Sequence, residues 1–102
     1  MKKFIAQRKL LYSLKGEDVR NEFVIGITAP YIVDQSMVSF PIGNGFMGCD
    51  VQISGLEEDG SKVYGADSLQ ALNLASDVES FLKVLQKKYD LYWLSGEPYF
   101  ED

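Results

Sequence analysis

Residues 67–89 read DSLQALNLASDVESFLKVLQKKY, and this stretch decides the fold class. Apolar residues recur in it at spacings of three and four, which places them on one face of a helix. Asp67 is a favourable N-cap, and Gln70 three residues later completes a pattern like a capping box. We therefore predict one long helix from Asp67 to Tyr89. Its apolar face is predicted to contain Leu72, Ala75, Val78, Leu82, Leu85 and Tyr89, widened by Leu69, Leu74, Phe81 and Val84.

The residues before this helix alternate in the manner of half-buried strands. Apart from Asn21, apolar side chains occupy the odd positions from Val19 to Ala29, where Pro30 ends the pattern, and again from Met47 to Ile53. Residues 4–14 and 62–64 are also rich in strand-forming types. Strands followed by a helix predict an α+β fold. In it, an antiparallel meander of four to five strands packs against one long C-terminal helix.

The length of 102 residues fits a single α+β domain, residues 1–102, with an aromatic and acidic tail at about residues 90–102. The chain has no His, which excludes His-based triads, metal sites and pH switches. Its one cysteine, Cys49, cannot form an intramolecular disulfide. Apolar residues near the N-terminus are interrupted by Gln7-Arg8-Lys9, and no apolar run is long enough to span a membrane. We therefore expect a cytoplasmic protein.

Charge is distributed unevenly along the chain, whose formal net charge is −5. Residues 1–20 carry six basic and two acidic groups, whereas residues 21–82 carry nine acidic groups and one basic group, Lys62. Folding either mixes these signs over one surface or leaves an acidic face suited to a basic partner. The acidic balance argues against nucleic-acid binding.

Four sequence patterns resemble known catalytic or ligand-binding motifs, but each lacks a feature that its chemistry requires. Residues 43–48, GNGFMG, have dinucleotide-motif spacing but precede a strand instead of opening a helix, so we expect a turn. Cys49 lies at an inward strand position with no His to activate it, so we expect a buried thiol. Residues 57–60, EEDG, lack the ligand spacing of a calcium loop. No catalytic, cofactor-binding or metal-binding residue is predicted, although a small enzyme using Asp50, Asp67 or Asp77 stays a minor alternative.

Two irregular stretches are rich in apolar and aromatic side chains. Residues 30–46 either contain a short extra strand at Met37–Phe40, which we expect, or form a hydrophobic binding loop. The tail aromatics Tyr92, Trp93, Tyr99 and Phe100 either cap the core or serve as interface anchors.

The helix entry also carries a family resemblance. Residues 65–75, GADSLQALNLA, resemble the helix entry of a family of small, uncharacterised bacterial proteins, a domain of unknown function with a G-x-D-S-x-Q-A-L motif at this point. The resemblance covers about residues 19–85 and implies a bacterial origin and strands followed by a helix. It supplies no catalytic residue. The positions that match the family's upstream marks are Gly26, Pro30, Cys49, Ile53 and Gly55.

Small size, an acidic middle and spare aromatics favour a non-enzymatic protein-binding module. Its sharpest form is a bacterial immunity protein that neutralises a cognate toxin, such as a basic nuclease of contact-dependent growth inhibition. The alternative is a structural or adaptor subunit that homo-oligomerises through a strand edge or the tail. We expect no membrane or nucleic-acid partner, and a monomer or weak homodimer. The predicted contact residues are the charges Asp50, Glu57, Glu58 and Asp59 and the anchors Tyr31, Phe40 and Trp93.

Overall fold

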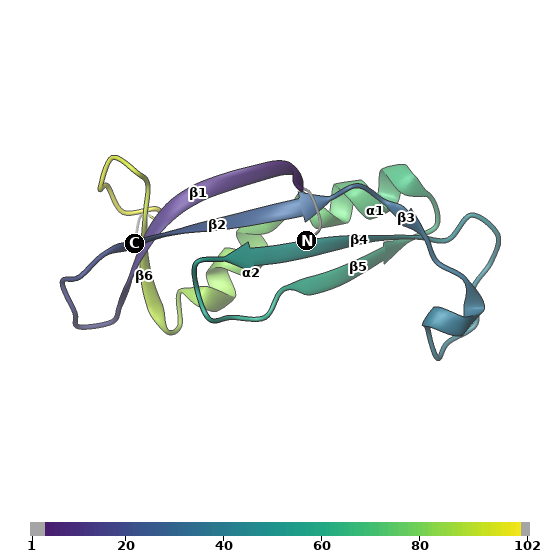
Figure 1. Ribbon diagram of the computed structural model, residues 1–102, viewed down its shortest axis with the longest axis horizontal. Helices are drawn as coiled ribbons and strands as arrows, with labels where there is room; N and C mark the ends of the chain where they lie inside the picture. Colours follow the sequence, from purple (N-terminus) through teal and green to yellow (C-terminus); the bar gives the residue numbers. More distant parts are fainter. Residues whose placement is uncertain (1–3, 101–102) are drawn as a thin grey trace.

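The computed structural model describes residues 4–100, which form a six-stranded antiparallel sheet with two short helices on one face (Figure 1). This arrangement confirms the predicted α+β class. The strands are β1 (Phe4–Leu14), β2 (Asn21–Thr28), β3 (Tyr31–Ile32), β4 (Met47–Ser54), β5 (Ser61–Gly65) and β6 (Tyr89–Tyr92). The helices are α1 (Ser68–Ala75) and α2 (Val78–Leu85), with a 3₁₀ turn, η1, at Gln35–Met37.

The strands are ordered as a meander with one late addition. β1 pairs with β2, β2 with β4 and β4 with β5, each time antiparallel. β3 and β5 both pair with Met47 and Gly48, so they must lie on opposite sides of β4. Val51 likewise pairs with both β2 and β5, so these two strands also lie on opposite sides of β4. β3 therefore lies on the same side of β4 as β2 and continues it. β6 joins the outer side of β1 through Leu11–Leu14.

A register slip separates β2 from β3. Ile27 pairs with Val51 and Tyr31 pairs with Gly48, so four steps on one strand match three steps on the other. Pro30 lies in the slip, and its missing N–H cannot contribute a ladder hydrogen bond. The extra residue moves Tyr31 to the face of the sheet opposite the helices, which we call the open face. Gly48, Asp50 and Gln52 of β4 lie on this open face.

The core lies between the other face of the sheet and the helices. Cys49 is fully buried there, and its Sγ donates a hydrogen bond to the carbonyl oxygen of Thr28 at 2.9 Å. Burial raises the pKa of this thiol, which therefore stays protonated and unreactive. The prediction of a core cysteine is confirmed. The other buried hydrophobic residues of the cluster are Leu10, Phe23, Ile25, Ile27, Val51, Ala71, Ala75, Leu82, Leu85, Tyr89, Leu91 and Tyr99.

The prediction of one continuous helix from Asp67 to Tyr89 is wrong. Helix α1 begins as expected, because Asp67 accepts a hydrogen bond from the backbone N–H of Gln70 at 2.8 Å. It ends at Ala75, and α2 starts anew at Val78 after Asp77, whose carboxylate accepts a hydrogen bond from the Ser80 hydroxyl at 2.8 Å. The break turns part of the expected apolar face outward. Leu69, Leu74 and Val84 are exposed.

The expected tail at about residues 90–102 overlaps a strand at its start. Asp90–Tyr92 belong to strand β6 and not to a tail, so the sheet has one strand more than the upper limit expected. Tyr99 is buried and its backbone N–H bonds to the Leu91 carbonyl at 2.9 Å. This part of the tail therefore covers the core. Residues 101 and 102, counted in the predicted tail, lie outside the described residues.

No helix within residues 4–100 is long and apolar enough to cross a membrane.

Candidate binding surface

Residues 33–46, which we call the apolar loop, project from one end of the elongated molecule (Figure 1). The expected strand at Met37–Phe40 is absent from this described segment, which instead contains the turn η1. Asp34 caps the turn by accepting a hydrogen bond from the backbone N–H of Ser36 at 2.9 Å. The loop is closed where the Val33 N–H bonds to the Phe46 carbonyl at 3.1 Å. Local polar groups thus shape a segment that has little regular structure.

One side chain holds the two halves of the apolar loop together. The Gln35 amide nitrogen donates to the Phe40 carbonyl at 2.7 Å, and its amide oxygen accepts from the Ile42 N–H at 3.3 Å. A single glutamine therefore takes the place of a backbone ladder across this loop. The bonds restrict the backbone on both sides of Pro41 and hold Phe40 in one place.

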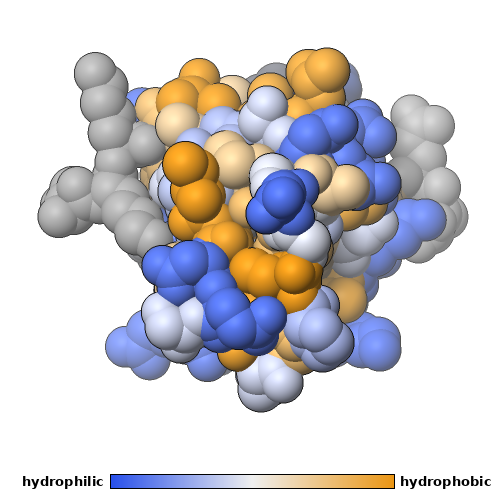
Figure 2. All heavy atoms as spheres, turned by 90° about the vertical axis from the view of Figure 1, so that its right-hand side faces the viewer, coloured by the Kyte–Doolittle hydropathy of each residue, from blue (hydrophilic) through white to orange (hydrophobic). Residues whose placement is uncertain are grey.

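Aromatic rings support the loop from the open face. Phe46 stacks on Tyr64 with ring centroids 5.6 Å apart, and Phe40 meets both rings edge-on at 5.9 and 5.8 Å. Phe40 nevertheless keeps 41% of its surface exposed, and Met37 of the same loop is 53% exposed. Figure 2 looks onto this end of the molecule and shows hydrophobic side chains near the middle of the view, bordered by hydrophilic ones. An apolar patch with a supported aromatic ring is a typical protein-contact surface.

The stem of the loop contains a polar cluster under Tyr31. The Tyr31 ring covers Gly48, where a Cβ atom would come within 2.8 Å of it. The Tyr31 hydroxyl donates to Asp50 Oδ1 at 2.7 Å, and the Lys62 ammonium lies 3.7 Å from the same oxygen. Burial, with this bond to Asp50, raises the pKa of Tyr31 far above its usual range, so the phenol stays a hydrogen-bond donor.

The expectation that Asp50 faces solvent as a contact residue is wrong. Alternation places it correctly on the open face, but the residue is only 3% exposed because Tyr31 and its neighbours cover it. Its backbone N–H also bonds to the Thr28 hydroxyl at 3.1 Å. Asp50 therefore anchors the stem of the loop and is not available to a partner.

The acidic turn between β4 and β5 divides into exposed and structural carboxylates. Glu57 and Asp59 are exposed, whereas Glu58 is half-buried. Glu58 Oε2 accepts hydrogen bonds from the Tyr89 hydroxyl at 2.9 Å and the Lys88 ammonium at 3.2 Å. The bond from Tyr89, followed by that from Lys88, lowers the pKa of Glu58. Glu58 thus ties this turn to the start of β6.

The predicted contact residues do not form one surface. Tyr31 and Phe40 lie at the end of the sheet where β4 begins, and the acidic turn follows the opposite end of β4. β4 has eight residues. A rise of about 3.3 Å per residue separates the two groups by roughly 25 Å. Of the predicted contact residues, only Tyr31 and Phe40 belong to the loop end and are accessible there.

Trp93, the remaining predicted anchor, belongs to a third region. It is 42% exposed and packs on Tyr99 with ring centroids 4.6 Å apart. The Arg8 guanidinium lies 5.7 Å from the Trp93 ring and donates hydrogen bonds to Glu79 and to the Tyr99 hydroxyl. These contacts fasten the tail to β1 and α2, so Trp93 has a structural role beside its exposed surface.

The other candidate chemical groups have structural partners. Asp67 caps α1 through the backbone N–H of Gln70, and the Asp77 carboxylate accepts a hydrogen bond from the Ser80 hydroxyl. Gly45 has φ +82° in the turn that precedes β4, as expected for residues 43–48. Within residues 4–100, no group of three His, Cys, Asp or Glu side chains is placed to hold a metal ion.

Sequence reasoning missed Gln35 and Tyr64, which shape and support the apolar loop. Gln35 acts through a contact seven residues away, and Tyr64 reaches Phe46 across a strand pair. The aromatic content of residues 40–64 was the only available signal for this cluster.

Comparisons of the chain with protein-family models, with curated proteins and with solved structures give no match.

Proposed function

We propose that this protein is a non-enzymatic binding module that contacts a partner protein through the apolar loop. The observation that carries the proposal is the loop itself, which is held by its own hydrogen bonds and keeps apolar side chains at the surface. Phe40 is the proposed central anchor and Met37 a second contact, because these two side chains of the loop retain 41% and 53% exposure.

Pre-organisation gives this surface its value for binding. A loop that must be ordered on association loses part of its affinity to conformational entropy. Here Gln35 fixes the backbone near Phe40, while Phe46 and Tyr64 support the ring. An aromatic side chain held in this way is the usual kind of residue to carry most of an interface's energy.

The partner that we propose is a basic bacterial toxin domain, which would make the protein its immunity protein in the cytoplasm. The excess of nine acidic over one basic group in residues 21–82 supports a basic partner. The exposed carboxylates Glu57 and Asp59 lie far from the apolar loop, so in this proposal they attract the partner through the long-range field and do not touch it. The resemblance of residues 65–75 to a bacterial family agrees with this setting.

The side chains that could act in catalysis are either held protonated or already engaged in contacts within the protein. The Cys49 thiol and the Tyr31 phenol both have raised pKa values, so neither ionises readily as a nucleophile or base. The buried Asp50 is engaged by Tyr31 and Lys62. These contacts support a binding role over catalysis.

A growth-protection experiment tests the proposal. The protein is co-expressed with the toxin domain encoded by the adjacent gene, and survival is compared for wild type, Phe40→Asp and Trp93→Ala. We expect wild type and Trp93→Ala to protect, and Phe40→Asp to lose protection while remaining folded by circular dichroism. The proposal is overturned if wild type protects against no neighbouring toxin, or if Phe40→Asp protects equally well.

Association kinetics separate steering from contact. Replacing both Glu57 and Asp59 by Lys should slow association with the toxin domain and reduce its salt dependence, with little change in the dissociation rate. Phe40→Ala should instead speed dissociation, as expected for a central anchor worth about 2 kcal/mol or more. Equal effects of both changes on dissociation would show that the acidic turn touches the partner.

A further inference from the structure

Strand β1 has one edge that is paired with another strand over only part of its length. β2 pairs with one side of it from Phe4 to Tyr12, and β6 pairs with the other side at Leu11–Leu14. Among residues 4–100, no strand pairs with that second side between Phe4 and Leu10. Backbone N–H and C=O groups along such an edge can accept a further strand.

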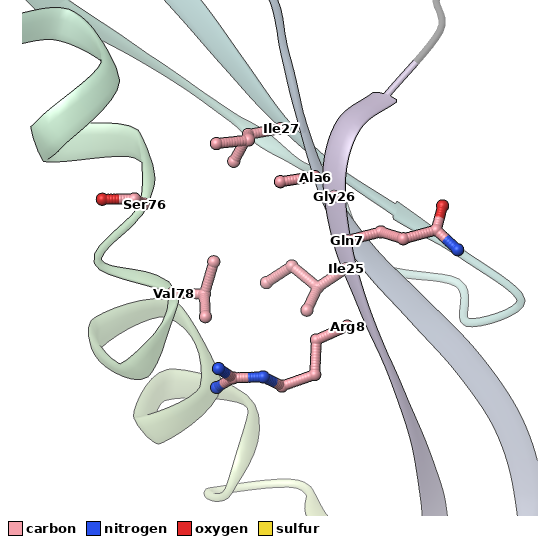
Figure 3. A pocket seen from close by; sticks show the side chains of 8 residues that line it. All are labelled: Ala6, Gln7, Arg8, Ile25, Gly26, Ile27, Ser76 and Val78. Carbon is pink, nitrogen blue, oxygen red and sulfur yellow. The ribbon is translucent and has the colours of Figure 1, made fainter. Parts of the chain in front are cut away.

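The free edge lies beside an apolar groove between the sheet and the helix break. The groove has a volume of about 120 Å³, and Ala6, Ile25, Ile27 and Val78 point into it (Figure 3). A second, mostly apolar hollow lined by Ile5, Leu69 and Leu72 continues it toward α1. Ile5 is 53% exposed and Leu69 is 78% exposed. A strand added to β1 would cover both hollows from the side.

Charge at this edge is neutralised within the chain. Arg8 forms an ion pair with Glu79 at 3.0 Å, and Lys9 lies 4.0 Å from Glu22. The basic character of β1 is thus balanced where the edge is free, and no unpaired charge in residues 4–10 calls for an oppositely charged peptide. An occupant whose own edge carries balanced charges therefore meets no charge repulsion here.

We infer that the occupant is a second copy of this chain, whose β1 pairs antiparallel with β1 about a two-fold axis at Gln7. In this register Gln7 faces Gln7 of the second copy, Ala6 faces Arg8, and Ile5 faces Lys9. Neither Arg8 nor Lys9 meets a like charge, and each aliphatic stem lies against an apolar residue. β6 begins to pair at Leu11, so it leaves the window from Phe4 to Leu10 open for the second copy.

Other features limit the strength of this contact. The register of β1 and β2 shifts between Phe4 and Ala6, a bulge that shortens the regular part of the edge. A few cross-strand pairs form a small interface, so the dimer is weak and reversible. The inference is independent of the proposed function, because the apolar loop lies at residues 33–46 and takes no part in it.

Charge substitution at Gln7 tests the axis directly. Gln7 is exposed, and its side chain points away from the groove toward the open face (Figure 3). Sedimentation equilibrium is measured over a wide concentration range for wild type, Gln7→Glu, Gln7→Lys and an equimolar mixture of the two variants. Gln52→Glu is the matched control, because Gln52 shares the open face and the same cross-strand row through Gly26 but lies two strands from the edge. Thermal melting of each variant verifies the fold.

We expect wild type and Gln52→Glu to self-associate reversibly. Each Gln7 variant alone should associate about five- to tenfold more weakly, because like charges then face each other at the axis. The mixture should regain association at least equal to that of wild type, since opposite charges are then paired.

Three results would overturn the inference. Wild type that stays monomeric at every concentration shows that the edge is not used by a second copy. Association unchanged by charges at Gln7 places the contact elsewhere, for example at the free side of β5. Weakened association that the mixture does not restore excludes the two-fold register at Gln7 and leaves the edge to another extended segment.

Discussion

The apolar loop at residues 33–46 and the tail segment at residues 93–100 have similar compositions and opposite roles. Both are irregular, and both carry aromatic side chains. Bonds within the loop hold it together, chiefly through Gln35. Contacts with distant residues hold the tail in place, including Arg8 from β1, Glu79 from α2 and Arg20, which donates to the Gly96 carbonyl at 3.1 Å.

This difference separates a presented surface from a structural cover. Phe40 rests on neighbouring rings and keeps much of its surface exposed, whereas Tyr99 is only 9% exposed. A segment tied to itself can meet a partner without disturbing the core. A segment tied to several elements contributes to their stability and is costly to displace.

Tyr99→Ala should have the largest effect, because it removes a buried ring and the hydroxyl that joins Arg8 to Glu79. We expect the free energy of unfolding to fall by about 3 kcal/mol in urea denaturation. Phe40→Ala is the matched change in the loop and should cost less than about 1 kcal/mol, since that ring is half in solvent. A larger loss of unfolding free energy for Phe40→Ala than for Tyr99→Ala would contradict this difference between the loop and the tail.

Tyr31→Phe should have an intermediate effect at the stem of the loop. The change keeps the ring over Gly48 and removes the hydrogen bond to the buried Asp50 carboxylate. We expect a loss of about 1.5 kcal/mol in unfolding free energy, as for hydrogen bonds to charged groups. A loss near zero would show that other contacts of Asp50 compensate for the missing hydroxyl.

Gln35→Ala should have a small effect on global stability and a large local one. Both halves of the loop lose their shared amide, so we expect a cost of about 0.5–1 kcal/mol and faster hydrogen exchange at the Ile42 N–H. Gln35→Glu keeps an oxygen that can accept from Ile42 and loses the donor to Phe40. Its exchange at Ile42 should stay closer to wild type. Exchange unchanged in both variants would contradict the role of Gln35.

Glu58→Gln should have the smallest effect, visible through its pH dependence. The folded pKa of Glu58 is lowered, chiefly by the Tyr89 hydroxyl and then by Lys88, so its ionised form stabilises the fold. This contribution is complete above the unfolded pKa of about 4.3. It is lost as pH falls through the lower folded value, so the stability difference from wild type should shrink there. The exposed neighbour Glu57 provides the matched charge-removal control, Glu57→Gln, measured over the same pH range.

Much of the sheet could be predicted because local alternation follows burial. The odd positions Phe23, Ile25 and Ile27 of β2 and Cys49 and Val51 of β4 are buried as expected. The break after Ala75 was missed although Asp77 at the N-cap position favours a helix start, because the apolar spacing runs through it. Short β6 was missed because four residues after a helix give too little alternation to distinguish a strand.

The candidate site was predictable only in part, because its key contacts depend on the folded chain. Alternation assigned Asp50 to the right face but could not show that Tyr31 covers it, since Tyr31 reaches that face only through the slip at Pro30. The exposed Phe40 was found from composition. Glu58 has a structural role and Glu57 does not because Glu58 is bound by Tyr89, a residue distant in sequence.

The register slip at Pro30 also affects how the sequence of this protein can change during evolution. Beyond the slip, two residue pairs, Tyr31–Gly48 and Ile32–Met47, join the stem of the loop to that side of β4. The pairing of Val24–Ile27 with β4 is complete before the slip. Insertions or deletions within residues 33–46 therefore leave the alignment of the core strands intact. Different loops can be exchanged on an unchanged framework, so the surface at this end of the molecule can diversify without a new fold.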